Sequence, residues 1–163
     1  MAPINDIEKN IFTLEQLKKQ VAARKDAGQK IAFTNGVFDI LHQGHIFSLT
    51  EAAAQADYLI VAINADASVK RLKGKQRPIN AQDARALVVA ALRMVDAVII
   101  FEEDTPLQLI TTLWPDVLIK GGDYTIEQIA GAKEVIAHGG RVIINPIVEG
   151  FSTSSIIRAM QEK

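Results

Sequence analysis

Two histidines, His42 and His45, flank Gly44 directly after a short apolar run and before a stretch of helical character. A helix N-terminus has free N–H groups and a partial positive charge, so it attracts phosphate. Two imidazoles there add hydrogen-bond donors that can stabilise the negative charge developing on phosphate oxygens. The preceding Asn35-Gly36 pair favours a tight turn whose backbone amides can face a ligand. The spacing therefore predicts a phosphate site.

Two other interpretations of this histidine pair stay open. Histidines three residues apart could bind a metal, but zinc takes three or four protein ligands. The chain has no cysteine, and its third histidine, His138, is distant in sequence. The pair could also be capping or merely buried, although the surrounding turn and helix start favour the phosphate site.

Other common nucleotide and hydrolase motifs are absent. There is no GxxxxGK[ST] and no GxGxxG after the first apolar run, which argues against a P-loop and a dinucleotide-binding site. The serines are not in a GxSxG turn, which argues against an α/β-hydrolase.

Short apolar runs alternate with helical patterns along the chain. Strands are expected at residues 30–34, 58–63, 97–101, 117–119 and 141–145, and helices at 46–56, 83–94, 105–113, 126–137 and from about 152–155 onward. The runs are β-branched and nearly continuous, as in strands buried on both faces. The pattern predicts an α/β, Rossmann-like doubly wound sheet of about five parallel strands with helices on both faces. Ligands bind such sheets beyond the carboxyl ends of the strands.

Composition limits the class of protein. With 163 residues, residues 1–163 are expected to form one domain: an N-terminal helix at about 13–27, with a capping-box pair, and a core from about 30 to 163. The net charge of −1 gives no sign of nucleic-acid binding, and no apolar run is long enough to span a bilayer. The N-terminus lacks a signal-peptide core, so a cytoplasmic location is expected.

The motifs also carry a family resemblance. The stretch FTNGVFDILHQGHI, the LRMVD segment and the EGFSTS segment resemble the cytidylyltransferase-like nucleotidyltransferases. The blocks VKRLKGKQRPI and DVLIKGGDYTIEQIAGAKEV narrow this resemblance to D-glycero-β-D-manno-heptose 1-phosphate adenylyltransferases. Because such domains also occur fused to a sugar kinase, the length predicts the stand-alone form.

The resemblance implies an activity. The sugar phosphate attacks the α-phosphorus of ATP in line, giving ADP-heptose and pyrophosphate without a covalent enzyme intermediate. The substrates are small molecules, Mg²⁺ is held mainly by the triphosphate and no residue is expected to be a dedicated metal ligand. A homodimer is possible. A cytidylyltransferase acting on glycerol phosphate, or a similar alcohol phosphate, is the first alternative, and a non-catalytic nucleotide-binding module is the second.

The expected site residues fall into three groups. Catalytic roles are expected for His42, His45, Lys73 and Ser152. Nucleotide binding is expected for Thr34, Asn35, Gly36, Phe38, Gly44, Arg93, Lys120, Gly121, Ser152, Thr153 and Ser154. Sugar-phosphate binding is expected for Asp39, Asp66, Lys73 and Asp123.

Several of these residues have a structural alternative. Asp39 could cap a turn, the serine cluster could be a plain helix N-cap, and Arg93 could pair with an acid. The cations of residues 70–77 could form a solvated face. The absence of periodicity there instead suggests a mobile loop that closes over phosphates, with Lys73 the favoured contact.

Overall fold

Five parallel strands form the centre of the molecule, a computed structural model that describes residues 4–146, 150 and 152–161. The strands are β1 (Ile31–Gly36), β2 (Tyr58–Asn64), β3 (Ala97–Phe101), β4 (Val117–Gly121) and β5 (Arg141–Asn145). The helices are α1 (Ile4–Glu8), α2 (Leu14–Asp26), α3 (Gln43–Ala53), α4 (Asp66–Lys73), α5 (Gln82–Ala90), α6 (Leu107–Leu113), α7 (Ala132–Ala137) and α8 (Thr153–Gln161), with a 3-10 turn η1 (Ile126–Gln128).

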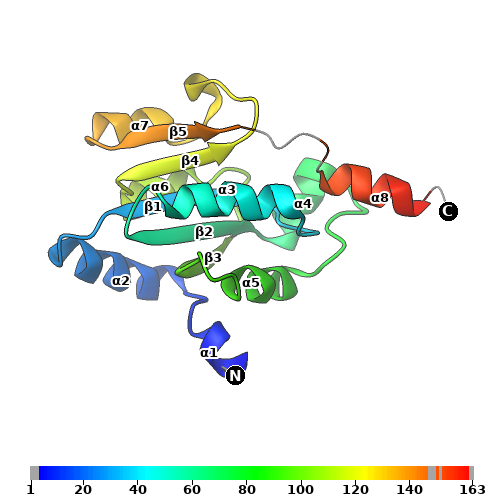
Figure 1. Cartoon of the computed structure of the whole chain (residues 1–163), viewed down its shortest axis with the longest axis horizontal. Coiled ribbons are helices and arrows are strands. Elements are labelled where there is room, and N and C mark those ends of the chain that lie inside the picture. The colour runs from blue at the N-terminus through cyan, green and yellow to red at the C-terminus, as the bar shows by residue number, and fades with distance from the viewer. Residues whose placement is uncertain (1–3, 147–149, 151, 162–163) are drawn as a thin grey trace.

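The strand order is β3-β2-β1-β4-β5, so the order reverses between β1 and β4 (Figure 1). All pairs are parallel, with Ala32 of β1 aligned to Leu59 of β2 and to Val117 of β4. The loops that follow β1 and β4 therefore diverge at the same edge. This arrangement leaves a crevice at the reversal point, where ligands bind in open α/β sheets.

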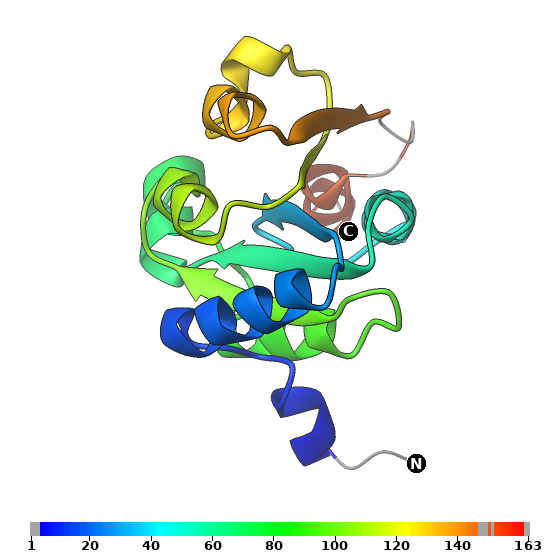
Figure 2. The ribbon, with the colours of Figure 1, turned by 90° about the vertical axis from the view of Figure 1, so that its left-hand side faces the viewer.

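Two apolar layers cover the sheet, one on each face. All seven residues of β2 are buried, as expected for a strand covered on both sides. Helices α2, α6 and α7 pack on one face, and α3 and α5 pack on the other (Figure 2). The doubly wound α/β fold predicted from the alternating pattern is confirmed.

Helix α2 begins at a capping box, which is a local sequence signal. The Thr13 side chain accepts from the Gln16 backbone N–H at 3.3 Å, and the Gln16 side chain accepts from the Thr13 N–H at 2.9 Å. This reciprocal capping box satisfies two backbone donors. The helix then buries Leu17 and Val21 against the sheet.

Two segments differ from the sequence-based expectation. The helix expected at 126–137 divides into η1 and α7, because Gly131 has φ +84° and a Cβ there would lie 2.7 Å from Ile110 Cδ1. Residues 70–73, expected to belong to a mobile loop, form the last part of α4 (Asp66–Lys73) instead. Ser68 and Val69 of α4 are buried, and this burial stabilises the short helix.

None of the helices within the described parts of the chain is both long enough and apolar enough to cross a membrane.

Candidate functional site

Three adjoining hollows lie at the carboxyl edge of the sheet. The first has a volume of about 280 Å³ and is bounded by the turn after β1, the start of α3 and the end of β4. It contains many of the predicted nucleotide residues. Its lining is Thr34, Asn35, Gly36, Phe38, His42, Gly44, His45, Ser48, Leu49, Lys120, Gly121, Gly122, Tyr124 and Pro146.

The turn after β1 brings the backbone close to this hollow. Phe38 has φ +49° and is buried, and its ring lies under Gly36, where a Cβ would meet the ring at 2.9 Å. Gly36 therefore needs to lack a side chain, whereas Phe38 keeps a strained backbone for its packing. The Phe38 ring also contacts His45, with ring centroids 5.2 Å apart.

The two histidines sit at the start of α3 with their rings stacked, centroids 3.9 Å apart and planes 28° apart. His42 is the N-cap residue, but its side chain makes no capping hydrogen bond, so the capping alternative is wrong. The Nδ1 atoms of both rings are buried and have no partner among the described residues. A ligand that pairs with these atoms would recover the cost of leaving them unpaired.

Burial also sets the charge of these rings. It lowers the pKa of His42, and it lowers the pKa of His45 to about 4 with a further contribution from the nearby His42. Both rings are therefore neutral near pH 7 in the free protein. An anionic ligand would raise both pKa values, because an opposite charge favours the protonated form.

The end of β4 forms the opposite wall. Lys120 is largely buried, and its Nζ lies 5.5 Å from the centre of the Tyr124 ring. Burial, and then the positive charge of Lys73, lower the pKa of Lys120. A Cβ on Gly121 would lie 2.9 Å from Ser48 Oγ, so this glycine lets β4 approach α3 closely. The wall thus combines a desolvated cation with exposed backbone.

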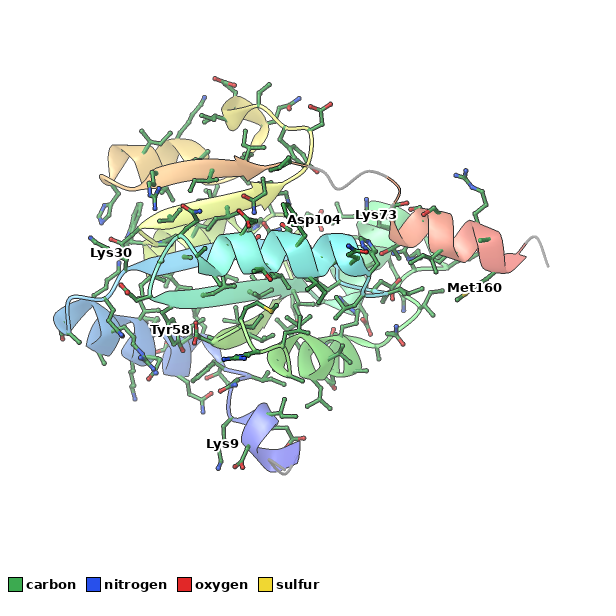
Figure 3. The ribbon with its side chains drawn as sticks, in the orientation of Figure 1. Lys9, Lys30, Tyr58, Lys73, Asp104 and Met160 are labelled. Carbon is green, nitrogen blue, oxygen red and sulfur yellow. The ribbon has the colours of Figure 1, made fainter. Side chains whose placement is uncertain are left out.

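The second and third hollows continue from the first. They have volumes of about 420 Å³ and about 170 Å³, and both share Asn35, Lys120 and Tyr124 with the first. Lys73, Arg77 and Asp104 line the second, beside Thr153 and Ser154. Figure 3 shows Asp104 and Lys73 near one another, with Lys30 and Tyr58 farther to the left. The shared residues join the hollows into one cleft.

Lys73 reaches the cleft from a helix and not from a mobile loop. Lys70, Arg71 and Lys73 occupy the last turn of α4, where cations complement the helix dipole. Lys73 is exposed and lines the second hollow, whereas Lys75 lines none of the three. The preference for Lys73 among the loop lysines stays a prediction that this position supports.

The Asp39 side chain binds the loop that follows α4. Its side chain is completely buried, and its carboxylate accepts from the Ile79 and Asn80 backbone N–H groups and from Arg77 Nε at 2.6 Å. Burial acts to raise the pKa of Asp39, but these hydrogen bonds from Asn80, Ile79 and Arg77 outweigh it and the pKa is lowered. The carboxylate holds the 74–80 loop, which favours a structural role, and direct sugar-phosphate binding by Asp39 stays a prediction.

The Asp66 side chain forms an ion pair outside the cleft. Its carboxylate accepts from Arg85 Nη2 at 2.7 Å, and Asp66 lines none of the three hollows. Arg85 is fully buried and donates to the carbonyl oxygens of Val37, Asn64 and Asn80. This acid therefore orients Arg85, and its sugar-phosphate role stays a prediction that its position does not support.

Sequence reasoning missed Arg85. The only signal was its place on the apolar face of α5, where it precedes Ala86 and lies four residues before Val89. A buried cation needs partners, and here the ends of two strands and a loop supply them.

Arg93 does not reach the cleft. It is exposed in the turn that precedes β3, and Asp96 next to it pairs with the backbone of Leu59 near the start of β2. This is the amino edge of the parallel sheet, opposite the hollows. This position does not support nucleotide binding by Arg93 within a single chain, and that role stays a prediction.

The start of α8 combines capping with proximity to the cleft. Ser152 Oγ accepts from the Ser155 N–H at 3.0 Å, which is the N-cap alternative, and Ser152 lines none of the three hollows. Thr153 Oγ1 donates to the Ile40 carbonyl at 3.1 Å and so ties α8 to the loop after β1. Thr153 and Ser154 line the second hollow. Their binding roles, and any role of Ser152, stay predictions.

The structure bears only partly on two further predictions, those for Asp123 and for the EGFSTS segment. Asp123 is exposed between two lining residues but lines none of the hollows, so its role stays a prediction. Of the EGFSTS segment, Glu149 and Phe151 lie outside the described residues.

The third histidine lies away from the cleft. His138 stacks on Trp114 at the amino edge of the sheet, with ring centroids 4.0 Å apart, far from the other two histidines.

Known proteins resemble this chain over most of its length. The family model described as cytidylyltransferase-like matches residues 33–159, which include both histidines and the start of α8. The chain belongs to the cytidylyltransferase-like family of nucleotidyltransferases.

Particular relatives narrow the comparison. The chain is 53% identical over 152 residues to the bifunctional protein HldE of Shigella flexneri serotype 5b, and 52% identical to HldE of Escherichia coli K12. These matches cover 93% of the chain, which spans about a third (32%) of the length of these relatives.

Solved structures agree with the fold. A lipopolysaccharide core biosynthesis protein from Thermoplasma volcanium matches with a TM-score of 0.60 and 31% identity, over 74% of this chain and 98% of the other. A pantoate-beta-alanine ligase from Francisella tularensis matches with a TM-score of 0.59 over 93% of this chain and 76% of the other. At 16% identity this second likeness concerns the fold alone.

Proposed function

We propose that this chain transfers AMP from ATP to D-glycero-β-D-manno-heptose 1-phosphate, giving ADP-heptose and pyrophosphate. The observation that carries the proposal is the continuous cleft, which joins a hollow lined by His42, His45 and Lys120 to a second one lined by Lys73. Two phosphate-bearing substrates need adjacent cationic or amide-rich sites, and the cleft offers both.

The reaction needs positioning and charge stabilisation more than covalent chemistry. A phosphate oxygen of the sugar phosphate attacks the α-phosphorus, the new P–O bond forms and the bond to pyrophosphate breaks. His42 and His45, at the N-terminus of α3, would donate hydrogen bonds to the α-phosphate as negative charge develops there. Lys120 would neutralise the same charge from the wall of β4.

The second cationic group would hold the acceptor. Lys73 lines the second hollow, and Arg77 joins it from the loop that Asp39 anchors. The cations would bind the phosphate of the incoming sugar and bring its oxygen toward the α-phosphorus. Thr153 and Ser154, at the start of α8, would contact the β- and γ-phosphates.

Mg²⁺ is proposed to enter with ATP, coordinated by phosphate oxygens and water. Within residues 4–146, 150 and 152–161, no group of three or more acidic or histidine side chains lies close enough together to hold an ion. The donor set therefore suits an ion that the triphosphate carries. Bound Mg²⁺ would neutralise phosphate charge.

Heptose as the acceptor rests on the resemblance of the KGGDYT and IEQIAG blocks and on the relatives. The match to HldE spans most of this chain, and the Thermoplasma relative is titled a lipopolysaccharide core biosynthesis protein. We therefore propose that the product supplies lipopolysaccharide synthesis. Pairing of two chains is a separate prediction, which sedimentation velocity would check.

The test is a substrate panel. Purified protein is incubated with Mg²⁺, either ATP or CTP, and either heptose 1-phosphate or glycerol phosphate, and pyrophosphate release is followed. The expected result is release with ATP and the heptose, and release at least 100-fold slower with the other combinations. Turnover with CTP and glycerol phosphate alone would replace the proposal with the cytidylyltransferase alternative. No release with any pair would favour a non-catalytic module.

A further inference from the structure

Asp104, which follows β3, places a carboxylate on the acceptor side of the cleft. It lines both the second and the third hollow, and its side chain is 53% exposed. Figure 3 shows Asp104 near Lys73. No sequence pattern distinguishes this residue from the other two acids of the stretch Glu102–Asp104.

One oxygen of this carboxylate is already held. Arg71 Nε and Nη2 both lie 2.7 Å from Asp104 Oδ1, and Nη2 also donates to the Glu102 carbonyl at 2.7 Å. No donor in the described parts of the chain reaches Asp104 Oδ2. Arg71 therefore fixes the direction of the carboxylate and leaves its second oxygen able to accept hydrogen bonds.

Other acids around the cleft do not compete for this role. Asp39, which lines the same hollow, is completely buried and already accepts from the 77–80 loop. Asp66 and Asp123 line none of the hollows. In the second and third hollows, as far as the structure describes them, Asp104 is the one carboxylate that can meet a ligand.

The charges within the cleft favour one orientation of an acceptor that has a phosphate at one end. Lys120 and Asp104 line both the second and the third hollow, whereas Lys73 lines the second alone, so cations attract phosphate mainly in the second hollow and Asp104 repels it. The third hollow, lined by Asp104, Thr105 and Gln128, continues away from the histidines. An acceptor whose phosphate meets the lysines would therefore present its opposite end to Asp104.

We propose that Asp104 recognises the acceptor sugar by accepting hydrogen bonds from its exocyclic hydroxyl groups, at the end remote from the phosphate. A carboxylate is an acceptor only, so it suits a diol, and charge-assisted hydrogen bonds of this kind are strong. An acceptor without these hydroxyls would leave Asp104 Oδ2 without these hydrogen bonds, which costs binding. This inference rests on the proposed function and names the group that sets acceptor choice.

The experiment compares Asp104→Asn with wild type and with Glu103→Gln as the matched control. Glu103 is the adjacent exposed acid, its loss removes the same charge, and it lines none of the hollows. Rates are measured with heptose 1-phosphate and with β-D-mannose 1-phosphate, which lacks one hydroxymethyl group. For Asp104→Asn the KM for the heptose is expected to rise about 10-fold or more, while the KM for ATP stays within about twofold. The heptose-to-mannose ratio of kcat/KM is expected to fall about fivefold or more, and Glu103→Gln is expected to match wild type.

A second variant keeps the carboxylate but removes its orientation. Arg71→Met should raise the heptose KM in the same direction by a smaller factor, and both variants should keep the thermal midpoint of wild type because these side chains are half exposed. Should Asp104→Asn unfold, Arg71→Met alone decides.

The two ways of failing are distinct. If wild type releases no pyrophosphate with heptose 1-phosphate, the proposed function fails. If wild type is active but Asp104→Asn and Arg71→Met keep its KM and its acceptor ratio, the function stands and the assignment of Asp104 is overturned.

Discussion

The rings of His42 and His45 stack at 3.9 Å between centroids, and the Nδ1 atom of each is buried without a partner in the described chain. Two neutral imidazoles at a helix N-terminus present donors without a fixed charge. The pair is therefore arranged to respond to a phosphate whose charge changes during the reaction.

The first prediction removes each ring in turn. His42→Ala and His45→Ala are each expected to lower kcat by roughly 10²-fold or more, because a positioned donor to a developing oxyanion contributes about that much. His138→Ala is the control, since this histidine stacks on Trp114 at the opposite edge of the sheet and should leave kcat unchanged. Wild-type turnover in both cleft variants would refute the proposed mechanism.

The second prediction concerns pH and the stability of the free protein. The pKa of His45 is about 4 when folded and near 6.5 when unfolded, so between these values the unfolded chain binds more protons. Stability is therefore fully present above about pH 6.5 and is lost as pH falls toward 4. Urea midpoints measured from pH 7 to 4.5 should fall in wild type and fall less in His45→Asn. If the urea midpoint falls equally with pH in both proteins, the loss of stability comes from groups other than His45.

The third prediction separates two neighbouring lysines. Lys73→Met should raise the KM for the sugar phosphate at least about 10-fold, because Lys73 lines the second hollow and a charged contact to phosphate is worth about 1.5–3 kcal/mol. Lys75→Met removes the same charge two residues away, outside the hollows, and should stay within twofold of wild type. Equal effects would mean that the charge acts only through the general field of the 70–77 segment.

Much of the fold was predictable because its signals are local. The β2 run is apolar at nearly every position, and the structure buries all seven of its residues, so the pattern alone indicated a strand covered on both faces. Thr13 and Gln16 marked the start of α2 for the same reason, since a capping box is made by residues three apart. The position of the cleft then followed from the sheet rule for ligand binding.

The roles of residues whose partners are distant in sequence could not be predicted from local patterns. Asp39 and Asp66 follow β1 and β2 like ligand-binding acids, yet their partners, Arg77 and Arg85, come from residues 38 and 19 positions away. Helix α4 was not predicted, and in the structure it buries Ser68 and Val69. The position of Arg93 could not be predicted either, because a motif gives a residue's place in the sequence but not the edge of the sheet at which it lies.

The fourth prediction tests the structural role of Asp39. Asp39→Asn places an amide where the carboxylate accepts from two backbone N–H groups and from Arg77, so at least one donor loses its acceptor in a buried place. The free energy of unfolding in urea is expected to fall by about 2–4 kcal/mol, as when one partner of a buried ion pair is removed. Asp123→Asn, an exposed acid near the same cleft, should change it by less than about 0.5 kcal/mol. The sugar-phosphate KM should rise in Asp39→Asn together with the loss of stability, because the 74–80 loop carries Arg77 into the second hollow. A raised KM at unchanged stability would instead mean that Asp39 touches the substrate itself, and would restore the role that its position after β1 first suggested.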